Sequence, residues 1–316
     1  MPTMTRNVHL VAGGAGFIGS HIIDRLLTTP AHVICLDNLS TGTRANIEQH
    51  LTNPHFELVR HDIINAIDIE ADYIWNFACP ASPLHYQRDP VRTIRTNILG
   101  TANLLELAAR TRATFLQAST SEVYGDPIVH PQPETYWGNT NPIGPRACYD
   151  EGKRAAETLC FDYHRQHDVS IKVARIFNTY GPRMLPNDGR VISTFVRQAL
   201  QGEPLTIFGD GTHTRSFAHI NDTTEALHRL MLTPHSTTGP INIGNPNEFT
   251  IRELADLILE MTNSRSRIIH MPLPTNDPRQ RCPAITEAQH RLGWTPTTDL
   301  ATGLRDTIEY HRARHG

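Results

Sequence analysis

A glycine-rich turn near the N-terminus constrains the fold more than any other part of this sequence. Gly13, Gly16 and Gly19 recur every third residue, directly after the apolar run 8–12 and at the start of a segment with helical apolar spacing. Such a strand-to-helix turn lets the backbone approach a pyrophosphate, to which the helix N-terminus offers free N–H groups. Asp37 ends the next apolar run, where a carboxylate can accept hydrogen bonds from an adenosine ribose and repel a 2′-phosphate. The pattern predicts a dinucleotide site that favours NAD over NADP; a glycine turn without a ligand is the alternative.

Short apolar runs alternate with helix-length segments through the first half of the chain. The runs that we interpret as strands lie at 8–12, 32–36, 56–59, 73–78, 114–118 and 171–174. This alternation predicts an α/β fold, with a Rossmann-like, doubly wound parallel sheet and helices on both faces. After residue 178 prolines and glycines cluster, and helices are expected at 191–200, 222–232, 251–261 and 300–313. We expect a cofactor domain over 1–178 and a smaller, loop-rich substrate domain over 179–316, with the chain free to cross back to the sheet.

Composition excludes several classes of function. With 29 basic and 32 acidic residues the net charge is −3, which argues against a broad nucleic-acid or membrane-binding surface. No apolar run approaches the roughly 18 residues that a membrane helix needs. The five cysteines include no Cys-x-x-Cys pair, so neither a disulfide framework nor a metal site is expected. Residues 1–6 show no signal-peptide pattern, and we expect a cytosolic protein.

A tyrosine and a lysine four residues apart provide the clearest catalytic signal. Tyr149 and Lys153 would share one helix face, and Lys153 is one of two lysines in the chain. A nearby ammonium favours the phenolate, which can then remove a proton from a hydroxyl as hydride leaves its carbon. Thr120, Ser121 and Glu122 follow the strand at 114–118, where open α/β sheets bind ligands. Glu122 could serve as acid, base or orienter, or these residues could form a capping cluster with a solvated carboxylate.

At these motifs the chain resembles a known family. The glycine spacing is similar to that of the extended short-chain dehydrogenase/reductase superfamily. Nearly the whole chain resembles the UDP-glucuronate decarboxylases, also called UDP-xylose synthases. The segments that carry this resemblance lie at 79–83, 85–87, 90–97, 100–101, 119–127, 130–132, 136–138, 141–144, 148–154, 175–184, 188–191 and 214–217.

The resemblance implies a reaction and a set of site residues. NAD would oxidise C4 of UDP-glucuronate, the resulting β-keto acid would lose CO₂, and returned hydride would give UDP-xylose. Tyr149 would be the base and Lys153 its partner, with the sugar lined by Thr120, Ser121 and Glu122. The cofactor contacts would be Gly13, Gly16, Phe17, Ile18, Gly19, Asp37, Asn38, Asp62, Ile63, Ala78, Tyr149 and Lys153. The substrate contacts would be Pro80, Tyr86, Asn178, Arg190, Val191, Arg215 and Arg281, with Arg183 and Arg279 as further loop arginines.

Three alternative functions stay open beside this resemblance, and the chain differs from the family at three positions. A nucleotide-sugar 4-epimerase or a 4,6-dehydratase would keep the fold; dehydratases carry an aspartate where this chain has Ser121. A non-catalytic nucleotide-binding scaffold is the third, and the intact Tyr149–Lys153 pair argues against it. The chain departs from the family at His213, Cys282 and Ala284, where Gln, Lys and Asp are usual. The superfamily also implies a homodimer that pairs through the stretches 91–110 and 149–165.

Overall fold

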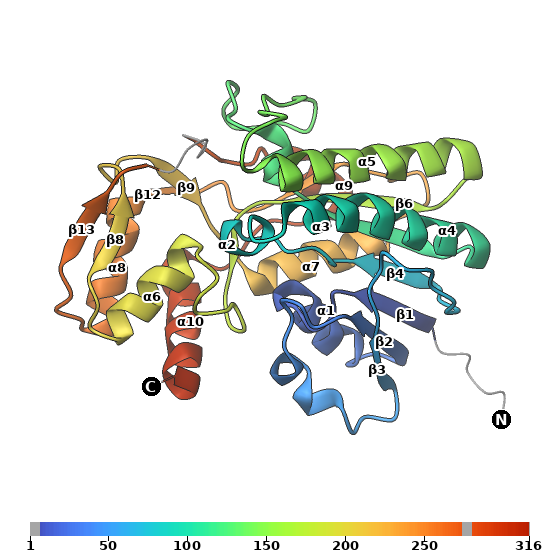
Figure 1. Ribbon diagram of the computed structural model, residues 1–316, viewed down its shortest axis with the longest axis horizontal. Coiled ribbons are helices and arrows are strands. Elements are labelled where there is room, and N and C mark those ends of the chain that lie inside the picture. Colours follow the sequence, from blue (N-terminus) through green and yellow to red (C-terminus); the bar gives the residue numbers. More distant parts are fainter. Residues whose placement is uncertain (1–6, 274–279, 316) are drawn as a thin grey trace.

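A parallel sheet organises the chain and brings the site residues to one edge. In this computed structural model, which describes residues 7–273 and 280–315, seven strands lie in the order β3-β2-β1-β4-β5-β6-β11 (Figure 1). Their bounds are β1 Asn7–Ala12, β2 Ala31–Asp37, β3 Phe56–Arg60, β4 Tyr73–Asn76, β5 Thr114–Thr120, β6 Ile171–Ile176 and β11 Ile241–Ile243. The strand order reverses between β1 and β4, so a crevice opens there at the carboxyl ends of the strands.

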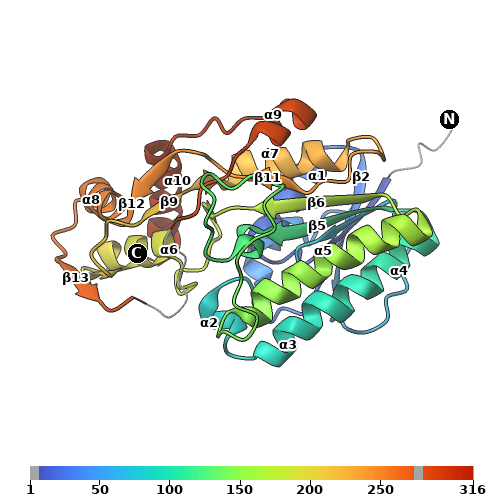
Figure 2. The ribbon, with the colours of Figure 1, turned by 90° about the horizontal axis from the view of Figure 1, so that it is seen from above.

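Helices cover both faces of the sheet, which explains why its strands are apolar runs. Helix α1 (Phe17–Leu26) packs with α7 (Ile220–Met231) on one face, while the other face carries α3 (Pro90–Arg95), α4 (Thr101–Thr111) and α5 (Ala147–His167) (Figure 2). A π-helical turn at Thr96–Gly100 joins α3 to α4. Buried apolar side chains form a separate core on each face. The predicted α/β class and doubly wound sheet are confirmed.

The later part of the chain forms a second lobe beside the carboxyl edge of the sheet. It contains the helices α6 (Val191–Leu200), α8 (Ile251–Thr262) and α10 (Leu300–His315). It also contains two small sheets. In one, β8 (Leu205–Phe208) pairs with β13 (Ile268–Met271), and in the other, β9 (Thr214–Ser216) pairs with β12 (Glu248–Thr250). A third apolar core fills this lobe. These strands have three or four residues and were not predicted, because such short segments carry too little periodicity.

The chain crosses between the two lobes more than once. The boundary expected at residue 178 falls between β6 and β7 (Thr179–Tyr180), which pairs with β10 (Ala218–His219). The chain then returns to the sheet, since β11 pairs in parallel with β6. Two short helices, α2 (Pro83–Tyr86) and α9 (Thr286–Leu292), and single turns at Arg44–Asn46, Glu48–His50 and Ser121–Tyr124 complete the elements. Among the described residues, no helix has the length and apolar character to cross a membrane.

Candidate active site

A cavity of about 1270 Å³ lies where the two lobes meet. It follows the crevice at the carboxyl ends of the strands and continues between the sheet and α6. The residues predicted from the sequence as cofactor, catalytic and substrate contacts line it, with the exception of Tyr86. Arg279 lies outside the described residues. The volume exceeds the roughly 300–1000 Å³ of ordinary ligand pockets, so the cavity has space for more than one ligand.

The glycine turn forms one end of the cavity, and its three glycines have different surroundings. A Cβ on Gly13, whose φ is +75°, would lie 2.7 Å from the carbonyl carbon of Phe77. A Cβ on Gly19 would lie 2.3 Å from the carbonyl oxygen of Gly13, so both glycines are required for packing within the turn. Gly16 is different, because Gly13 is its single close neighbour among described residues and the cavity lies beside it. The backbone at Gly16, Phe17 and Ile18 can therefore approach a phosphate at the start of α1.

Asp37 and its neighbours form the wall that was predicted to hold the adenosine ribose. The Asp37 carboxylate accepts hydrogen bonds from the backbone N–H groups of Ala15 (3.0 Å) and Leu39 (2.7 Å). Burial raises the pKa of Asp37. Beside it, the Asn38 amide donates to the Asp62 carboxylate over 3.0 Å. Ile63 and Ala78 line the same end, as does Arg92, which pairs with Asp62 and which the sequence analysis missed.

Helix α5 places Tyr149 and Lys153 together at the inner end of the cavity. The Lys153 ammonium lies 5.8 Å from the centroid of the Tyr149 ring and donates to the Ala118 carbonyl over 2.8 Å. Burial raises the pKa of Tyr149 and lowers that of Lys153, while a hydrogen bond with Thr120 lowers the tyrosine pKa. The sequence predicted a lowered pKa for Tyr149 beside Lys153, whereas burial raises the pKa of Tyr149 in this structure. The carbonyl of Ala118 holds the lysine in place.

Tyr86 stacks against the ring of Tyr149 and does not line the cavity. The two rings stack with centroids 5.1 Å apart and planes 7° from parallel. The Tyr86 hydroxyl is buried, and burial raises its pKa. We assign Tyr86 a packing contact that fixes the plane of the Tyr149 ring. Pro80, from the same segment, does line the cavity.

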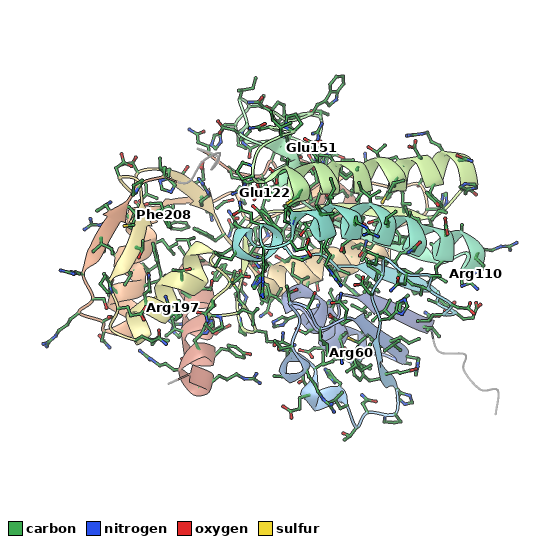
Figure 3. The ribbon with its side chains drawn as sticks, in the orientation of Figure 1. Arg60, Arg110, Glu122, Glu151, Arg197 and Phe208 are labelled. Carbon is green, nitrogen blue, oxygen red and sulfur yellow. The ribbon has the colours of Figure 1, made fainter. Side chains whose placement is uncertain are left out.

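Glu122 lies where the lobes meet (Figure 3). Two arginines, Arg146 and Arg281, form ion pairs with its carboxylate. Arg281 donates to both carboxylate oxygens over 2.8 Å each, and Arg146 donates over 2.7 Å. Although burial opposes ionisation, Arg281 and Arg146 lower the pKa of Glu122 to about 2. At neutral pH the side chain is a carboxylate, which favours the orienting role among the three considered from the sequence. Thr120 caps the turn by accepting from the Glu122 N–H over 3.2 Å, and Ser121 is buried beside it.

Asp150 is a titratable group of this site that the sequence analysis missed. It follows Tyr149 on α5 and is 7% exposed. Burial, reinforced by the Glu122 charge, raises the pKa of Asp150 to about 7, and one of its oxygens has no hydrogen-bond partner among the described residues. Nothing in the sequence pattern marks this residue, because its pKa depends on Glu122 and Arg281 from distant segments.

The second lobe supplies the far end of the cavity. Asn178 donates to the Ser216 carbonyl over 3.4 Å, and Arg215 donates to the Thr214 carbonyl over 2.8 Å. Arg190 pairs with Asp188, while Val191 begins α6 beside it. Lining residues that the sequence analysis did not single out include Phe208, which is 45% exposed. His213 and Arg183 also line the cavity, and Arg183 pairs with Asp24 on α1.

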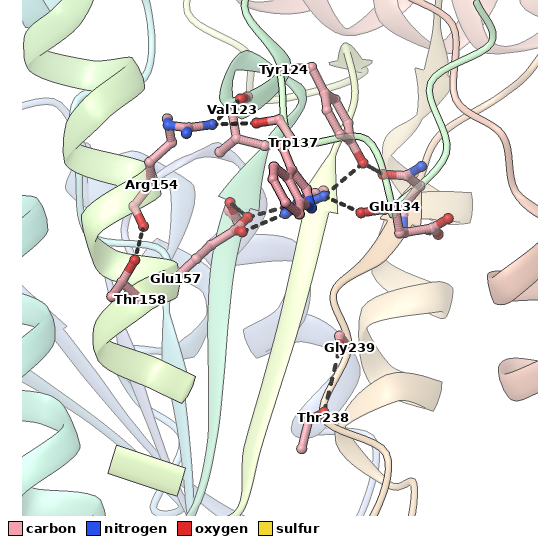
Figure 4. Close-up of polar contacts among 12 residues, drawn as sticks. Val123, Tyr124, Glu134, Trp137, Arg154, Glu157, Thr158, Thr238 and Gly239 are labelled. Atoms are coloured by element: carbon pink, nitrogen blue, oxygen red, sulfur yellow. Dashed lines mark hydrogen bonds and ion pairs between the residues drawn. The ribbon is translucent and has the colours of Figure 1, made fainter. Parts of the chain in front are cut away.

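A buried polar network supports β5 and α5, which carry Thr120 and Tyr149 (Figure 4). Glu157, one turn beyond Lys153 on α5, accepts from the Ser119 hydroxyl over 2.5 Å and from two Arg175 nitrogens over 2.7 and 3.0 Å. Arg175 also donates to the Tyr124 hydroxyl over 3.0 Å. Tyr124 in turn donates to Asn242 on β11 over 2.7 Å. The network joins α5, β5, β6 and β11, so it fixes the angle at which Tyr149 and Thr120 meet.

Comparison with known proteins places this site in a family. Residues 9–244 match the NAD dependent epimerase/dehydratase family. UDP-glucuronic acid decarboxylase 4 of Arabidopsis thaliana is 54% identical over 96% of this chain and 68% of its own length. UDP-glucuronic acid decarboxylase 1 of Danio rerio is 50% identical over 95% of this chain and 72% of its own. The chain belongs to the UDP-glucuronic acid decarboxylase family.

A solved structure with bound ligands is also similar. The UDP-glucuronic acid 4-epimerase of Bacillus cereus, in complex with UDP-glucuronic acid and NAD, superposes with a TM-score of 0.87 at 29% identity. The match covers 97% of this chain and 99% of that one. NAD is the cofactor of the family, and the glycine turn and Asp37 fit it. Gly16, Phe17 and Ile18 would hold its pyrophosphate, and Asp37 its adenosine ribose.

Proposed function

We propose that this chain converts UDP-glucuronate to UDP-xylose and CO₂, with NAD regenerated in each cycle. Identity above 50% to decarboxylases over nearly the whole chain supports the reaction. The charge beside Tyr149 supports the substrate. Arg146 and Arg281 both contact the Glu122 carboxylate there. Below about pH 7, where the neighbouring Asp150 holds its proton, these two guanidinium charges outnumber the single carboxylate charge. A sugar carrying a carboxylate would be attracted to this place more than a neutral sugar.

The residues of the chain would act on the oxygen at C4 and on the carboxylate at C6. Tyr149 would accept the proton of the C4 hydroxyl, while Thr120 would hold the tyrosine oxygen in line. NAD, when bound, supplies the hydride acceptor for C4 and returns the hydride at the end of the cycle. The C4 ketone is β to the C6 carboxylate, so the electron pair released with CO₂ enters the ketone as an enolate. A proton then adds at C5.

The ion-paired cluster of Glu122, Arg146 and Arg281 would position the sugar. Because its pKa is near 2, Glu122 would not release a proton at neutral pH and would keep Arg281 aimed at the sugar. Ser121 offers no acid for a leaving C6 hydroxyl, which disfavours the dehydratase. The 4-epimerase stays the second candidate, because the Bacillus cereus epimerase with UDP-glucuronic acid shares this fold over the whole chain.

One NMR experiment tests the reaction. Purified protein is mixed with UDP-glucuronate without added NAD, and the anomeric signals and released CO₂ are followed. UDP-xylose with CO₂ supports the decarboxylase; if nothing changes, NAD is added before the result is read. UDP-galacturonate without CO₂ would establish the epimerase, and silence with NAD present would contradict both. A Tyr149→Phe variant should keep NAD and UDP binding and lose about 10²–10⁴-fold in turnover; normal turnover would remove Tyr149 as the base.

We also propose a cytosolic homodimer. The helices α3 to α5 lie side by side on the outer face of the sheet (Figures 1 and 2), and Val91 and Leu99 there are 66% and 42% exposed. Pairing of two such faces would bury these side chains. Light scattering that shows a single 35.5 kDa species would contradict the dimer.

A further inference from the structure

Three metal-ligating side chains from distant parts of the chain meet behind the substrate end of the site. His130 comes from the proline-rich loop before α5, Glu248 from the start of β12, and Cys282 from the segment before α9. One ligand atom of each lies within 4.8 Å of the other two. The His130 imidazole Nε2 is 2.9 Å from the Glu248 Oε2. We propose that these three residues bind a divalent metal ion of the zinc class.

The donor set selects the kind of ion. A thiolate, an imidazole and a carboxylate together suit Zn²⁺, which binds all three, whereas Ca²⁺ and Mg²⁺ prefer oxygen ligands alone. In a tetrahedral zinc site neighbouring ligand atoms lie about 3.3–3.6 Å apart. His130 and Glu248, whose Nε2 and Oε2 atoms are 2.9 Å apart, would therefore separate slightly to admit the ion. Three protein ligands leave the fourth position for water. The Cys282 thiol is 2% exposed, and in the metal-free protein it donates to the Pro246 carbonyl.

The backbone already holds the three ligands in place. Gln132, two residues after His130, forms hydrogen bonds with Cys282 in both directions, each 2.9 Å long. The Thr214 hydroxyl donates to the second Glu248 oxygen over 2.6 Å, which leaves the first oxygen directed at His130. Such outer contacts orient ligands in established metal sites. Hydrogen bonds from residues outside the ligand set therefore preorganise the site.

A bound metal ion would hold in place the two segments that position Arg281 and Arg215 of the cavity. Cys282 follows Arg281, whose guanidinium contacts Glu122. Glu248 begins the strand β12, in which Phe249 pairs with Arg215 on β9. An ion at this position would tie the loop of His130 to both segments. This role does not depend on the reaction catalysed, so it stands apart from the proposed function.

The sequence analysis expected no metal site, because the ligands are 118 and 34 residues apart and form no motif. The three side chains come together only in the folded chain, where their ligand atoms lie within 4.8 Å of one another.

The test is cobalt binding to the full-length, NAD-loaded protein after treatment with a chelator. One equivalent of Co²⁺ should give a thiolate-to-cobalt charge-transfer band in the near ultraviolet, which Zn²⁺ then removes by displacement. The Cys282→Ser variant should lose the band and bind cobalt more weakly by more than the roughly 10–100-fold typical of lost outer contacts. A His235→Gln variant is the matched control, because His235 belongs to an exposed second cluster with His164 and Asp168 that has no thiol.

A second variant keeps the test decisive if Cys282→Ser does not fold. The His130 side chain is 35% exposed, so His130→Gln should fold and still weaken cobalt binding. Absence of the charge-transfer band in the wild-type protein would overturn the proposal. A band that survives the Cys282→Ser change, or cobalt affinity that is unchanged by His130→Gln, would overturn it as well.

Discussion

Replacing Glu122 by glutamine removes the charge between two buried arginines and keeps the shape of the side chain. Arg281 and Arg146 lower the pKa of Glu122 from its usual 4.5 to about 2, and at 1.36 kcal/mol per unit this corresponds to about 3 kcal/mol. Breaking a buried pair typically costs about 3–5 kcal/mol, because the remaining charge stays buried. For 316 residues a loss of about 3–5 kcal/mol lowers the melting temperature by about 5–8 °C.

Urea unfolding at saturating NAD, followed by tryptophan fluorescence, measures this loss. Glu287→Gln is the matched control, since its pair with Arg291 is 40–50% exposed and should contribute less than about 0.5 kcal/mol. The folded-state pKa of Glu122 lies below the unfolded value, so its contribution is complete above pH 4.5 and is lost as pH falls towards 2. The difference between Glu122→Gln and wild type should narrow in that window.

The activity of Glu122→Gln provides a second readout. If Glu122 orients Arg281, the sugar chemistry slows while UDP affinity is retained. The reasoning is refuted if Glu122→Gln destabilises the protein no more than Glu287→Gln does. A collapse of UDP affinity would instead make Glu122 a structural residue of the nucleotide end.

Three further predictions concern other parts of the site. Burial raises the pKa of Asp150 to about 7, so between about pH 4 and 7 Asp150 binds a proton in the folded state that it lacks in the unfolded state. The free energy of unfolding of the wild type, relative to that of Asp150→Asn, should therefore be smaller at pH 8 than at pH 5. Gly13→Ala should purify without bound nucleotide, because the added Cβ would meet the Phe77 backbone; extraction followed by absorbance measures the bound nucleotide. Gly202→Ala is the control and should retain NAD, because Gly202 has a similar φ of +68° and a Cβ there would have nothing within 4 Å. Glu157→Gln removes a charge that raises the pKa of Lys153, so the alkaline limb of the pH–rate profile should move to lower pH.

Local pattern was sufficient for the fold and for the cofactor end. The strands around Val11, Cys35 and Leu116 were predicted within a few residues, because a parallel sheet buried on both faces requires continuous apolar runs. The helix over α5 followed from spacing as well. The short strands of the second lobe and α9 escaped prediction, since their conformation depends on pairing with partners far along the chain.

The sequence by itself determined which chemistry the chain can carry: a glycine turn before a helix, an acidic residue after the second strand, and a tyrosine and a lysine on one helix face. These signals can be recognised in the sequence because each involves residues only a few positions apart. Only the tertiary structure decided the charge states, since Glu122 and Arg281 are separated by 159 residues and meet in the buried space between the lobes. Burial and charges brought together by folding control whether a carboxylate is an acid, a base or an anchor. The same long-range contacts bring His130, Glu248 and Cys282 together.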